Sequence, residues 1–501
     1  MSLRSIILKP IANFTKKRLI RSHSKAVSTQ RKTLKKILRK ARNTSFGKDH
    51  SFDDIKSYDD FKSKVPVRDY EELKSYFDRM VEGEKDVLWP GQPKYLAKTS
   101  GTTSGSKFIP ISHEAISHFI KASWNALMCY IADTGKADFF DGKMIFLQGS
   151  PEMEKMNGME IGRLSGIVYH HVPAWLHRNR LPSYKINCTE DWEEKVEKIV
   201  HETLDHDLRL ISGIPPWIIM YFERLLEVSD KKSIQEVFPD FKLFVHGGVN
   251  YQPYKNKIER LTGFPVDSIE TYPASEGFIA YQDSLSEEGL LLNLDAGIFY
   301  EFVPLSEYFE ENPKRLSLEE VELDQNYALI LSSNSGLWGY SIGDTVKFTS
   351  LNPYRLKVSG RVKHFLSAFG EHVIAEEVER AMLEICEKFR LKVTEYTVAP
   401  KVEVEGELPY HEWFVEFSEQ INNLEEVALA LDESMCRQNS YYKDLIEGKV
   451  LQKLKINNLG RDVFKDYMRL SGKLGGQNKV ARLSNDRRVA EGLEKVMLQK
   501  T

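Results

Sequence analysis

Short apolar strands alternate with helices over the larger part of this chain, and few folds accommodate such an alternation. Strands are predicted at residues 143–148, 208–211, 242–246, 266–272 and 327–332, with helices at 114–132, 192–204 and 216–227. A connection between two parallel strands has to cross the sheet, and it usually does so as a helix. The sequence therefore predicts an α/β fold, in which a large domain of mixed or parallel sheets is flanked by helices.

The pattern changes near Ser359-Gly360-Arg361. Beyond this point an amphipathic helix at 376–389 is followed by alternating strands at 393–399 and 411–417 and by a helix at 423–435. This order is typical of a small α+β domain. We therefore expect a large N-terminal domain over residues 1–362 and a small C-terminal domain over residues 363–501, joined by a short structured hinge.

Composition narrows the class of protein. The 501 residues are 41% hydrophobic and 29% charged, which is the range of packed globular proteins. No apolar stretch reaches the roughly 18–20 residues that a membrane-spanning helix needs. The four cysteines are far apart and form no CxxC pair, which argues against a disulfide framework and against a structural zinc site. We expect a soluble, cytoplasmic protein.

The N-terminal segment is strongly basic. Residues 1–48 contain 15 Lys and Arg and neither Asp nor Glu, which suits a mitochondrial presequence, an arm on an anionic surface or a solvated helix. Because apolar residues recur there at helical spacing, we favour a helix docked on the protein, and peripheral membrane contact stays an alternative. A single Phe in the first 45 residues is too few for stacking on bases, so we expect no nucleic-acid partner. The apolar stripe consists of Leu34, Ile37, Leu38 and Ala41.

The most informative segment runs from Thr99 to Lys107 and reads TSGTTSGSK. Its glycines let backbone amides approach a ligand, its hydroxyls can donate to phosphate oxygens, and Lys107 adds positive charge. The segment follows a predicted strand at 94–98, which favours a phosphate-binding loop, although a mobile surface loop has the same composition. Its spacing is not that of a Walker A loop.

Two further segments are candidates for binding: one places polar side chains at a strand end, and the other places an acid after a glycine turn. Residues 271–277 read TYPASEG and come directly after the predicted strand residues 266–270, and residues 340–344 read YSIGD. Glu276 offers the oxygen ligands that Mg²⁺ prefers, and Asp344 can accept hydrogen bonds from two ribose hydroxyls. The alternatives are a surface carboxylate for Glu276 and an ordinary Asx turn for Asp344.

In this order, the three segments resemble the signature SSGTxxG, YxxSE and YxxGD of the auxin-responsive promoter (Gretchen Hagen) family of acyl acid–amido synthetases. This family is part of the adenylate-forming superfamily, with the acyl-CoA synthetases, the adenylation domains of peptide synthetases and the luciferases. The sequence departs from the pattern at Thr99, which replaces the first Ser, and at Ser341, where an Arg often follows the Tyr. We expect a bacterial member of the family. Further similarities are Gly247-Gly248, Gly360-Arg361, FGEHV at 369–373, and Lys479 in GGQNK at 475–479.

The resemblance implies an enzyme that uses ATP and Mg²⁺ to adenylate a carboxylic acid. The acyl group then passes to an amine, expected to be an amino acid, with release of pyrophosphate and AMP. The small domain is expected to act as a mobile lid, and the protein to be a monomer or homodimer. Lys479 and Glu276 are the implied catalytic residues, Glu276 through Mg²⁺, and Lys473 is the alternative to Lys479. The residues implied in ATP or AMP binding are Thr99, Ser100, Gly101, Thr102, Thr103, Gly247, Gly248, Thr271, Tyr272, Ala274, Ser275, Glu276, Asp344 and Arg361.

The acyl pocket of similar proteins is formed by helices of the large domain. Core packing is the commoner role of the apolar and aromatic residues there. Two other functions stay open at this point. An acyl-CoA ligase would keep the adenylation and use CoA as the acceptor, whereas a non-catalytic protein would bind a nucleotide or an acyl group without using it. The candidates for the acyl pocket are Trp124, Met128, Tyr169, His170 and His171.

Overall fold

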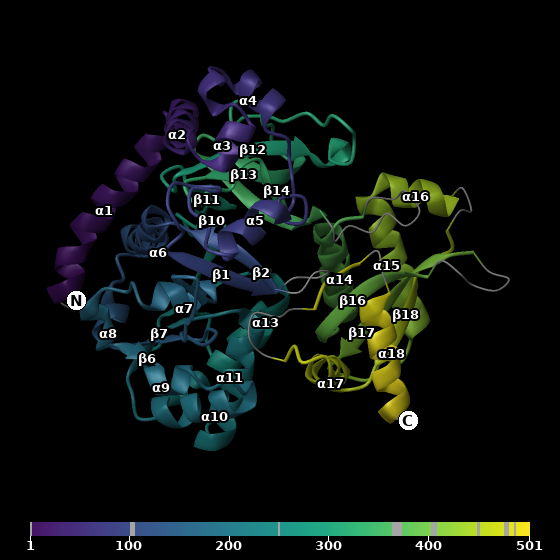
Figure 1. The fold of residues 1–501 in the computed structure, drawn as a ribbon. Helices are drawn as coiled ribbons and strands as arrows, with labels where there is room; N and C mark the ends of the chain where they lie inside the picture. The colour runs from purple at the N-terminus through teal and green to yellow at the C-terminus, as the bar shows by residue number, and fades with distance from the viewer. Residues whose placement is uncertain are drawn as a thin grey trace. The chain divides into compact units, whose positions relative to one another are not determined.

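The computed structural model describes residues 3–100, 106–248, 251–362, 373–401, 408–447, 451–474, 480–484 and 487–500 (Figure 1). The chain forms two compact units. The first comprises residues 1–342 and 346–357, and the second comprises residues 343–345 and 358–501. Relative to the boundary expected at 362/363, the second unit also takes in a short part of each of two neighbouring strands.

The larger sheet has eleven strands in the order β12-β13-β14-β15-β11-β10-β9-β8-β7-β3-β6. From β6 to β9 all neighbouring strands are parallel, whereas β9–β10, β10–β11, β11–β15 and β12–β13 are antiparallel. The fold is thus mixed α/β, as predicted. The parallel strands are β6 (Arg180–Leu181), β3 (Lys143–Phe146), β7 (Leu208–Ser212), β8 (Leu243–Gly247) and β9 (Asp267–Ala274). The others are β10 (Gly277–Tyr281), β11 (Leu290–Leu292), β15 (Tyr354–Arg361), β14 (Tyr340–Leu351), β13 (Asn326–Ser333) and β12 (Ile298–Pro304).

A second sheet of the first unit has the order β2-β1-β5-β4. Its strands are β1 (Tyr95–Ser100), β2 (Ser106–Ile111), β5 (Met159–Gly162) and β4 (Glu154–Met156). β1 and β2 pair antiparallel from Tyr95↔Ile111 to Ser100↔Ser106, so the hydroxyl-rich segment joins two strands of a hairpin. The sequence prediction, in which this segment leads from a strand into the next helix, was wrong because β2 intervenes. Pro110 and the polar start of β2 conceal that strand in the sequence.

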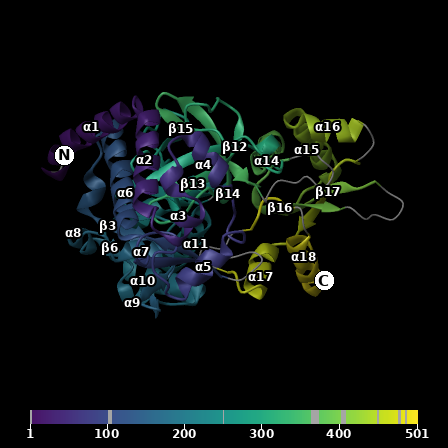
Figure 2. The ribbon, with the colours of Figure 1, turned by 45° about the horizontal axis from the view of Figure 1, so that its top comes forward.

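Two N-terminal helices lie on the outside of the first unit (Figure 2). α1 (Leu3–His23) packs along α6 (His113–Thr134), and α2 (Ala26–Ala41) packs on β12. The predicted apolar stripe of α2 is buried, which confirms the docked helix. Within the described residues, no helix is both long and apolar enough to cross a membrane. The short elements that follow α2 are α3 (Ser45–Asp49), η1 (Phe52–Asp54), α4 (Tyr58–Lys64) and α5 (Lys74–Val81).

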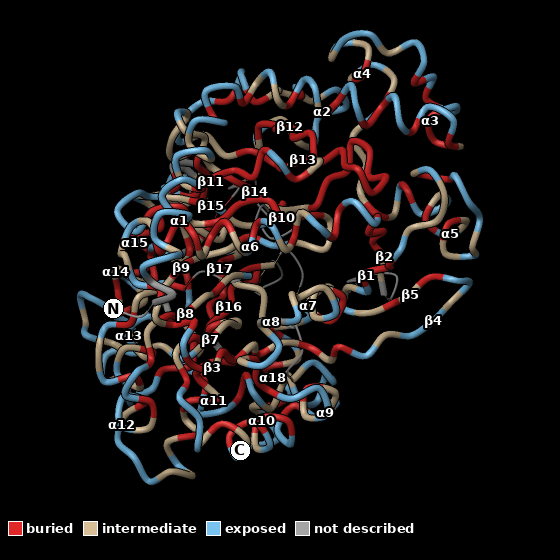
Figure 3. Tube along the Cα trace, turned by 90° about the vertical axis from the view of Figure 1, so that its left-hand side faces the viewer, coloured by how far each residue is buried: buried red, intermediate tan, exposed pale blue. Residues whose placement is uncertain are grey.

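Helices cover both faces of the parallel half of the large sheet. Successive side chains of a strand point to opposite faces, so Met144 joins the core beneath α6 while Ile145 joins the core on the other face. Figure 3 shows the central strands mostly buried and the helices alternating between buried and exposed positions. The second core is formed with α10 (Trp192–Thr203), α11 (Pro215–Ser229) and α13 (Gln252–Thr262). The remaining elements of this unit are η2 (Asp138–Asp141), α7 (Leu164–Tyr169), α8 (Ala174–His177), α9 (Tyr184–Asn187), α12 (Ile234–Val237) and η3 (Leu305–Glu307).

The second unit has a three-stranded sheet in the order β16-β17-β18. β16 (Val393–Lys401) and β17 (Tyr410–Phe417) are antiparallel, and β18 (Lys455–Leu459) joins β17 in parallel. The predicted helices and strands are confirmed as α14 (Ala375–Phe389), β16, β17 and α15 (Leu424–Gln438). The elements beyond them were not predicted: α16 (Ser440–Glu447), β18, α17 (Val463–Leu470) and α18 (Arg488–Lys500).

Candidate functional site

The carboxyl ends of β8 and β9 come into very close contact. Gly247 ends β8 and lies opposite Thr271 of β9, and a Cβ atom at Gly247 would come within 2.2 Å of the Thr271 carbonyl oxygen. The next residue, Gly248, has φ +80°, which side chains other than glycine rarely adopt. The glycine pair therefore lets the chain turn sharply while leaving backbone atoms open at the edge of the sheet, where ligands of α/β folds bind.

The neighbouring residue His246 anchors this turn. The Thr271 hydroxyl donates to the His246 carbonyl oxygen at 3.0 Å. The His246 ring is buried beside Tyr251, with 4.4 Å between ring centroids, and its Nδ1 has no hydrogen-bond partner. Burial lowers the pKa of His246 to about 3, so the ring is neutral at pH 7.

The segment TYPASEG forms the end of β9 and the turn into β10. Ala274 pairs with Gly277, so Ser275 and Glu276 occupy the tip of this hairpin, and both are half-buried. Tyr272 is buried within β9. Because β9 is the last of the parallel strands, Glu276 lies at the same edge of the sheet as Gly247. Glu276 is therefore positioned at a strand end, as the sequence predicted.

Much of the hydroxyl-rich segment lies outside the described residues, and so does Lys479. The predicted site residues outside the described part of the chain are Gly101, Thr102, Thr103 and Lys479, together with the side chain of Ser100. Thr99 is described and pairs with Lys107 across the β1–β2 hairpin. The Lys107 ammonium lies 5.2 Å from the centroid of the Tyr70 ring. The hairpin thus carries a cation next to its connecting loop, as a phosphate-binding loop would need.

In the second unit, Asp344 and Arg361 form an ion pair. The Asp344 Oδ1 and Arg361 Nε atoms are 3.1 Å apart, with the two side chains 18% and 53% exposed. Gly343 has φ +79°, and a Cβ atom there would lie 3.4 Å from Arg361 Nη2. The glycine before Asp344 therefore gives the arginine room to approach the carboxylate. The structure thus brings together two residues that the resemblance implied in nucleotide binding.

The departure at Ser341 is compensated by a contact in the first unit. The Ser341 hydroxyl lies 2.8 Å from the Tyr308 hydroxyl, and the Ser341 amide donates to the Arg68 carbonyl oxygen at 2.8 Å. Ser341 is buried. A larger arginine at this position would displace Tyr308, so Ser341 has a packing role here.

The five acyl-pocket candidates have different environments. Met128 is fully buried in the core, and Trp124 is half-buried beside Phe140. His170 and His171 are held by hydrogen-bond partners: His170 Nε2 lies 2.9 Å from the Pro151 carbonyl oxygen, and His171 Nε2 lies 2.8 Å from the Tyr95 hydroxyl. The Tyr169 ring is covered by a guanidinium group that the sequence reasoning did not single out.

Two buried cations were missed by sequence reasoning. Arg180 of β6 and Lys195 of α10 are 8% and 2% exposed. Neither lies in a motif, and the sequence shows nothing that separates them from surface cations. Only the three-dimensional structure shows that these side chains are buried.

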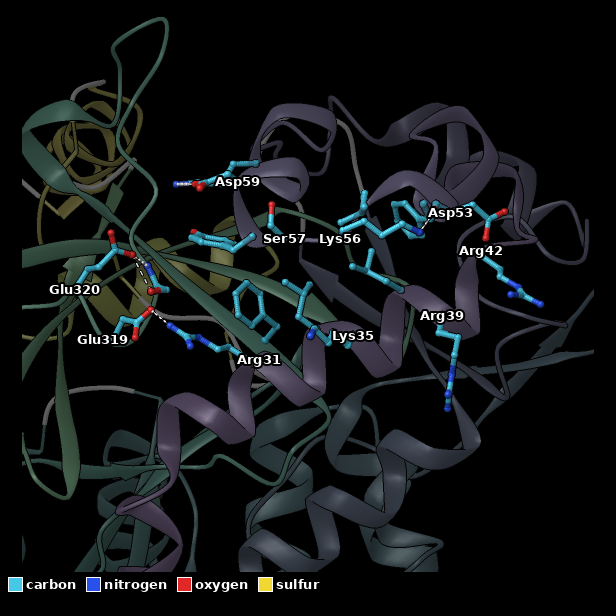
Figure 4. A pocket seen from close by; sticks show the side chains of 18 residues that line it. Arg31, Lys35, Arg39, Arg42, Asp53, Lys56, Ser57, Asp59, Glu319 and Glu320 are labelled. Carbon is cyan, nitrogen blue, oxygen red and sulfur yellow. Dashed lines mark hydrogen bonds and ion pairs between the residues drawn. The ribbon is translucent and has the colours of Figure 1, made fainter.

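A pocket of about 600 Å³ lies elsewhere, between α2, η1, α4 and β12 (Figure 4). None of the predicted site residues lines it. Its cations come largely from one face of α2, and one of them, Arg31, pairs with Glu319. The cations that line it from α2 and its C-cap are Arg31, Lys35, Arg39 and Arg42.

No group of three His, Cys, Asp or Glu side chains that could hold a metal ion occurs in the part of the chain that the structure describes. Glu276 is not part of such a group. This fits an ion such as Mg²⁺, which keeps water ligands and takes phosphate oxygens from a nucleotide.

Comparison with solved structures identifies the fold. The GH3.15 acyl acid amido synthetase matches with a TM-score of 0.79 at 16% identity, and the match covers 95% of both chains. A 2-hydroxyisobutyryl-CoA ligase, solved with an acyl-AMP and CoA, matches with a TM-score of 0.53 at 13% identity, over 91% of this chain and 90% of that one. The fold is therefore that of the adenylate-forming enzymes.

Curated relatives are similar over part of their length. Jasmonoyl–L-amino acid synthetase JAR4 from Nicotiana attenuata is 22% identical over 387 residues, which cover 64% of this chain and 66% of that protein. Indole-3-acetic acid-amido synthetase GH3.10 from Arabidopsis thaliana is 22% identical over 396 residues, 61% of this chain and 65% of that protein. These matches thus span just under two thirds of the length of the two relatives. Both are plant proteins and give no support to the expectation of a bacterial member.

Family models cover most of the chain. The GH3 family N-terminal domain matches residues 15–179 and 154–265, the central domain matches residues 291–361, and the C-terminal domain matches residues 376–488. The resemblance inferred from the three motifs is thereby confirmed. This chain belongs to the GH3 (Gretchen Hagen) family.

Proposed function

We propose that this chain is an ATP-dependent ligase that adenylates a carboxylic acid and transfers the acyl group to an amine, forming an amide. The observation that carries the proposal is that the three motifs occur in the family's order on a fold that matches GH3.15 over 95% of the chain. The relatives named above are a jasmonoyl–L-amino acid synthetase and an indole-3-acetic acid-amido synthetase, and an amino acid is the acceptor we propose here.

The chemistry explains why such an enzyme needs a nucleotide. A carboxylate is a poor electrophile because its leaving group would be oxide. In the first half-reaction a carboxylate oxygen attacks the α-phosphorus of ATP and pyrophosphate leaves. In the second, the amine nitrogen attacks the acyl carbon, AMP leaves, and the nitrogen loses a proton. Charge gathers on the α-phosphate in the first step, so donors and cations placed beforehand accelerate it.

We assign the roles residue by residue. Gly247, Gly248 and Tyr272 flank the adenine, and Asp344 with Arg361 holds the ribose. Glu276 would hold Mg²⁺, and the bound ion would neutralise charge on the phosphates. Lys479 contacts the acyl and phosphate oxygens in the first half-reaction. The phosphates lie against the backbone and hydroxyls of Thr99, Ser100, Gly101, Thr102 and Thr103, with Thr271, Ala274 and Ser275 at the neighbouring strand end.

The proposed partners are small molecules, namely the acid and the amine. A cytoplasmic location, a monomeric or homodimeric state, and peripheral membrane contact through the basic N-terminus stay predictions. So does the assignment of residues 1–362 to adenylation and residues 363–501 to the lid.

ATP–pyrophosphate exchange with a panel of aryl, indole and fatty acids tests the proposal. Exchange that depends on one class of acid establishes adenylation. Product formed with amino acids supports the amide ligase, whereas product formed only with CoA supports the thioester alternative. Nucleotide binding without exchange for any acid would favour the non-catalytic alternative.

Lys479→Ala and Lys473→Ala form a matched pair for the catalytic lysine. Lys473 is exposed and lies six residues before Lys479. We expect Lys479→Ala to lower exchange by a factor of about 100 or more, because a positioned cation is lost from the transition state. Lys473→Ala should leave exchange unchanged. The reverse pattern would transfer the role to Lys473.

A further inference from the structure

Arg180 is a buried cation with no carboxylate partner among the described residues. It is 8% exposed, and its Nη1 donates to the Tyr169 carbonyl oxygen at 3.4 Å. Its Nε is fully buried and has no acceptor among the described residues. The first unit has two comparable arginines, Arg315 and Arg355, and each forms two hydrogen bonds to a buried carboxylate, from Glu301 and Asp283 respectively. Arg180 is the exception among the three.

Two aromatic rings enclose the guanidinium. Its central carbon lies 3.8 Å from the centroid of the Tyr169 ring and 4.9 Å from that of the Phe146 ring. Burial lowers the pKa of Arg180 to about 10, so the group is still charged at pH 7. Stacking offsets part of the cost of burying a charge, but it leaves the in-plane N–H groups without acceptors.

A second buried cation, Lys195 of α10, lies near the carboxyl end of β3. Lys195 is 2% exposed and donates to the carbonyl oxygens of Gln148 and Asn187 at 2.9 and 2.6 Å. No ion pair to Lys195 is formed by any described residue. The side chains of Gln148 and Asn187 themselves have buried polar atoms without partners. Lys195 belongs to α10, on the opposite face of the sheet from Met144, so buried positive charge occurs on both faces near this end of β3.

The position of Arg180 separates it from the nucleotide residues. Arg180 pairs in register with Met144, which faces the core beneath α6. β6 lies three strands from β8 in the sheet, which is about 14 Å at the usual strand spacing of about 4.8 Å. Tyr169 ends α7, which contacts α6 on this face. An acyl chain that enters between the sheet and these helices would meet the guanidinium at its far end.

We propose that Arg180 binds a second carboxylate at the far end of the acyl acid, so that the substrate is a dicarboxylic acid. This inference rests on the proposed function, because it places the first carboxylate at the nucleotide. The planar guanidinium has two parallel N–H groups that match the two oxygens of a carboxylate, and no described acid competes for them.

The test compares acids that differ only at the far end. The pairs are octanoate and suberate, decanoate and decanedioate, and dodecanoate and dodecanedioate, each assayed by ATP–pyrophosphate exchange, so that the longest diacid can span the distance from the nucleotide strand to Arg180. We expect the wild-type kcat/KM to be about tenfold or more higher for at least one diacid than for its monoacid, since a desolvated charge pair is formed. Arg180→Met should abolish that preference by raising the KM of the diacid, while the monoacid is unaffected.

Controls separate binding from folding. Arg178→Met changes an exposed arginine two residues away and should alter the KM of neither the monoacid nor the diacid. Arg180→Lys retains the charge but loses the planar donor pair, and should give an intermediate KM. Thermal unfolding of each variant checks that the stacked environment is intact, and Arg180→Lys replaces Arg180→Met if the latter does not fold.

Calorimetric titration of each diacid in the absence of ATP tests the Arg180 site independently of the proposed ligase activity. Diacid binding that is lost in Arg180→Met supports the site even if no acid supports exchange, in which case the ligase proposal fails alone. Three results would overturn the inference: a wild-type preference for monoacids, no binding of any diacid, or an Arg180 effect on the KM of the amino acid instead of the acid.

Discussion

Gly247 lies where two parallel strands are too close for any side chain. A Cβ atom there would meet the carbonyl oxygen of Thr271 at 2.2 Å, and backbone atoms cannot rotate away as a flexible side chain can. We expect Gly247→Ala to lower the free energy of unfolding by about 1–3 kcal/mol and to weaken ATP binding. Gly460→Ala is the control, because its nearest neighbour, Val463 Cγ2, would be 4.0 Å away. Urea unfolding and nucleotide titration measure both effects. Equal stability of the two variants would contradict the packing argument.

His23 makes stability depend on pH. Burial lowers the pKa of this side chain to about 4, and its Nδ1 accepts a hydrogen bond from the Tyr354 amide at 3.2 Å. The unfolded chain binds the proton near pH 6.5, so the stabilisation is complete above that pH and is lost as the pH falls toward 4. We expect a loss of about 2 kcal/mol between pH 7.5 and pH 5 from this residue.

The pH effect is measured by urea unfolding of the wild type and of His23→Gln at both pH values. The variant should be less sensitive to acid than the wild type. His206→Gln, at an exposed position, should behave as the wild type does. An unchanged pH dependence in His23→Gln would show that other groups, such as the buried His246, cause it.

At this scale the sequence identified glycines and carboxylates in motifs but could not identify Arg180. A motif glycine is visible because its neighbours form a pattern with it. Arg180 is distinguished by having no acid beside it among the described residues, and that depends on which side chains β3, β6 and α7 bring near. Ser341 was read correctly as a departure, yet its contact with Tyr308 could not be foreseen because the two residues are far apart in the chain.

At the scale of secondary-structure elements, α2 both covers the core and forms hydrogen bonds to the edge strand β12. Gln30 lies on its buried face and makes two hydrogen bonds to β12: its Nε2 donates to the Ile298 carbonyl oxygen at 3.1 Å, and its Oε1 accepts from the Tyr300 amide at 2.8 Å. Gln30→Ala would leave both backbone groups buried and unpaired. We expect a loss of about 2–4 kcal/mol of unfolding free energy.

Lys32→Ala is the matched control for Gln30→Ala, because Lys32 lies on the exposed side of the same helix. Alanine favours the helix equally well at both positions, so helix propensity cancels in the comparison. Denaturant unfolding should show a change within about 0.5 kcal/mol for the control. Equal losses in both variants would mean that the hydrogen bonds to β12 contribute nothing net.

The parallel half of the large sheet was predictable and the antiparallel half was largely not. In the parallel half, short apolar strands alternate with amphipathic helices, a pattern that predicts parallel strands joined by helical crossovers. These strands are β3, β7, β8 and β9. β10 and β12 are buried along their whole length, so they show no alternation of apolar and polar residues. Without alternation or an intervening helix, a strand of this kind is not distinguishable from any other apolar run.

At the scale of the whole molecule, each unit has its own hydrophobic core. We therefore expect calorimetry to show two unfolding transitions. Of the seven tryptophans, Trp413 is buried in the second unit, and the other six lie in the first. Trp413→Phe should remove the fluorescence change of one transition while both persist by calorimetry. A single calorimetric transition, or a fluorescence profile unchanged by the substitution, would contradict independent unfolding.

The amide of Gln30 has a consequence for self-association. The margin of a sheet is a template on which another chain can add a strand, and proteins that expose it risk forming fibrils. Here the β12 margin is occupied by a side chain that imitates the donor and acceptor of a neighbouring strand, and the opposite margin, β6, is two residues long. Neither margin therefore presents a long row of unpaired backbone N–H and C=O groups to which another chain could add a strand. A homodimer of this protein would thus not extend the eleven strands from one subunit into the next.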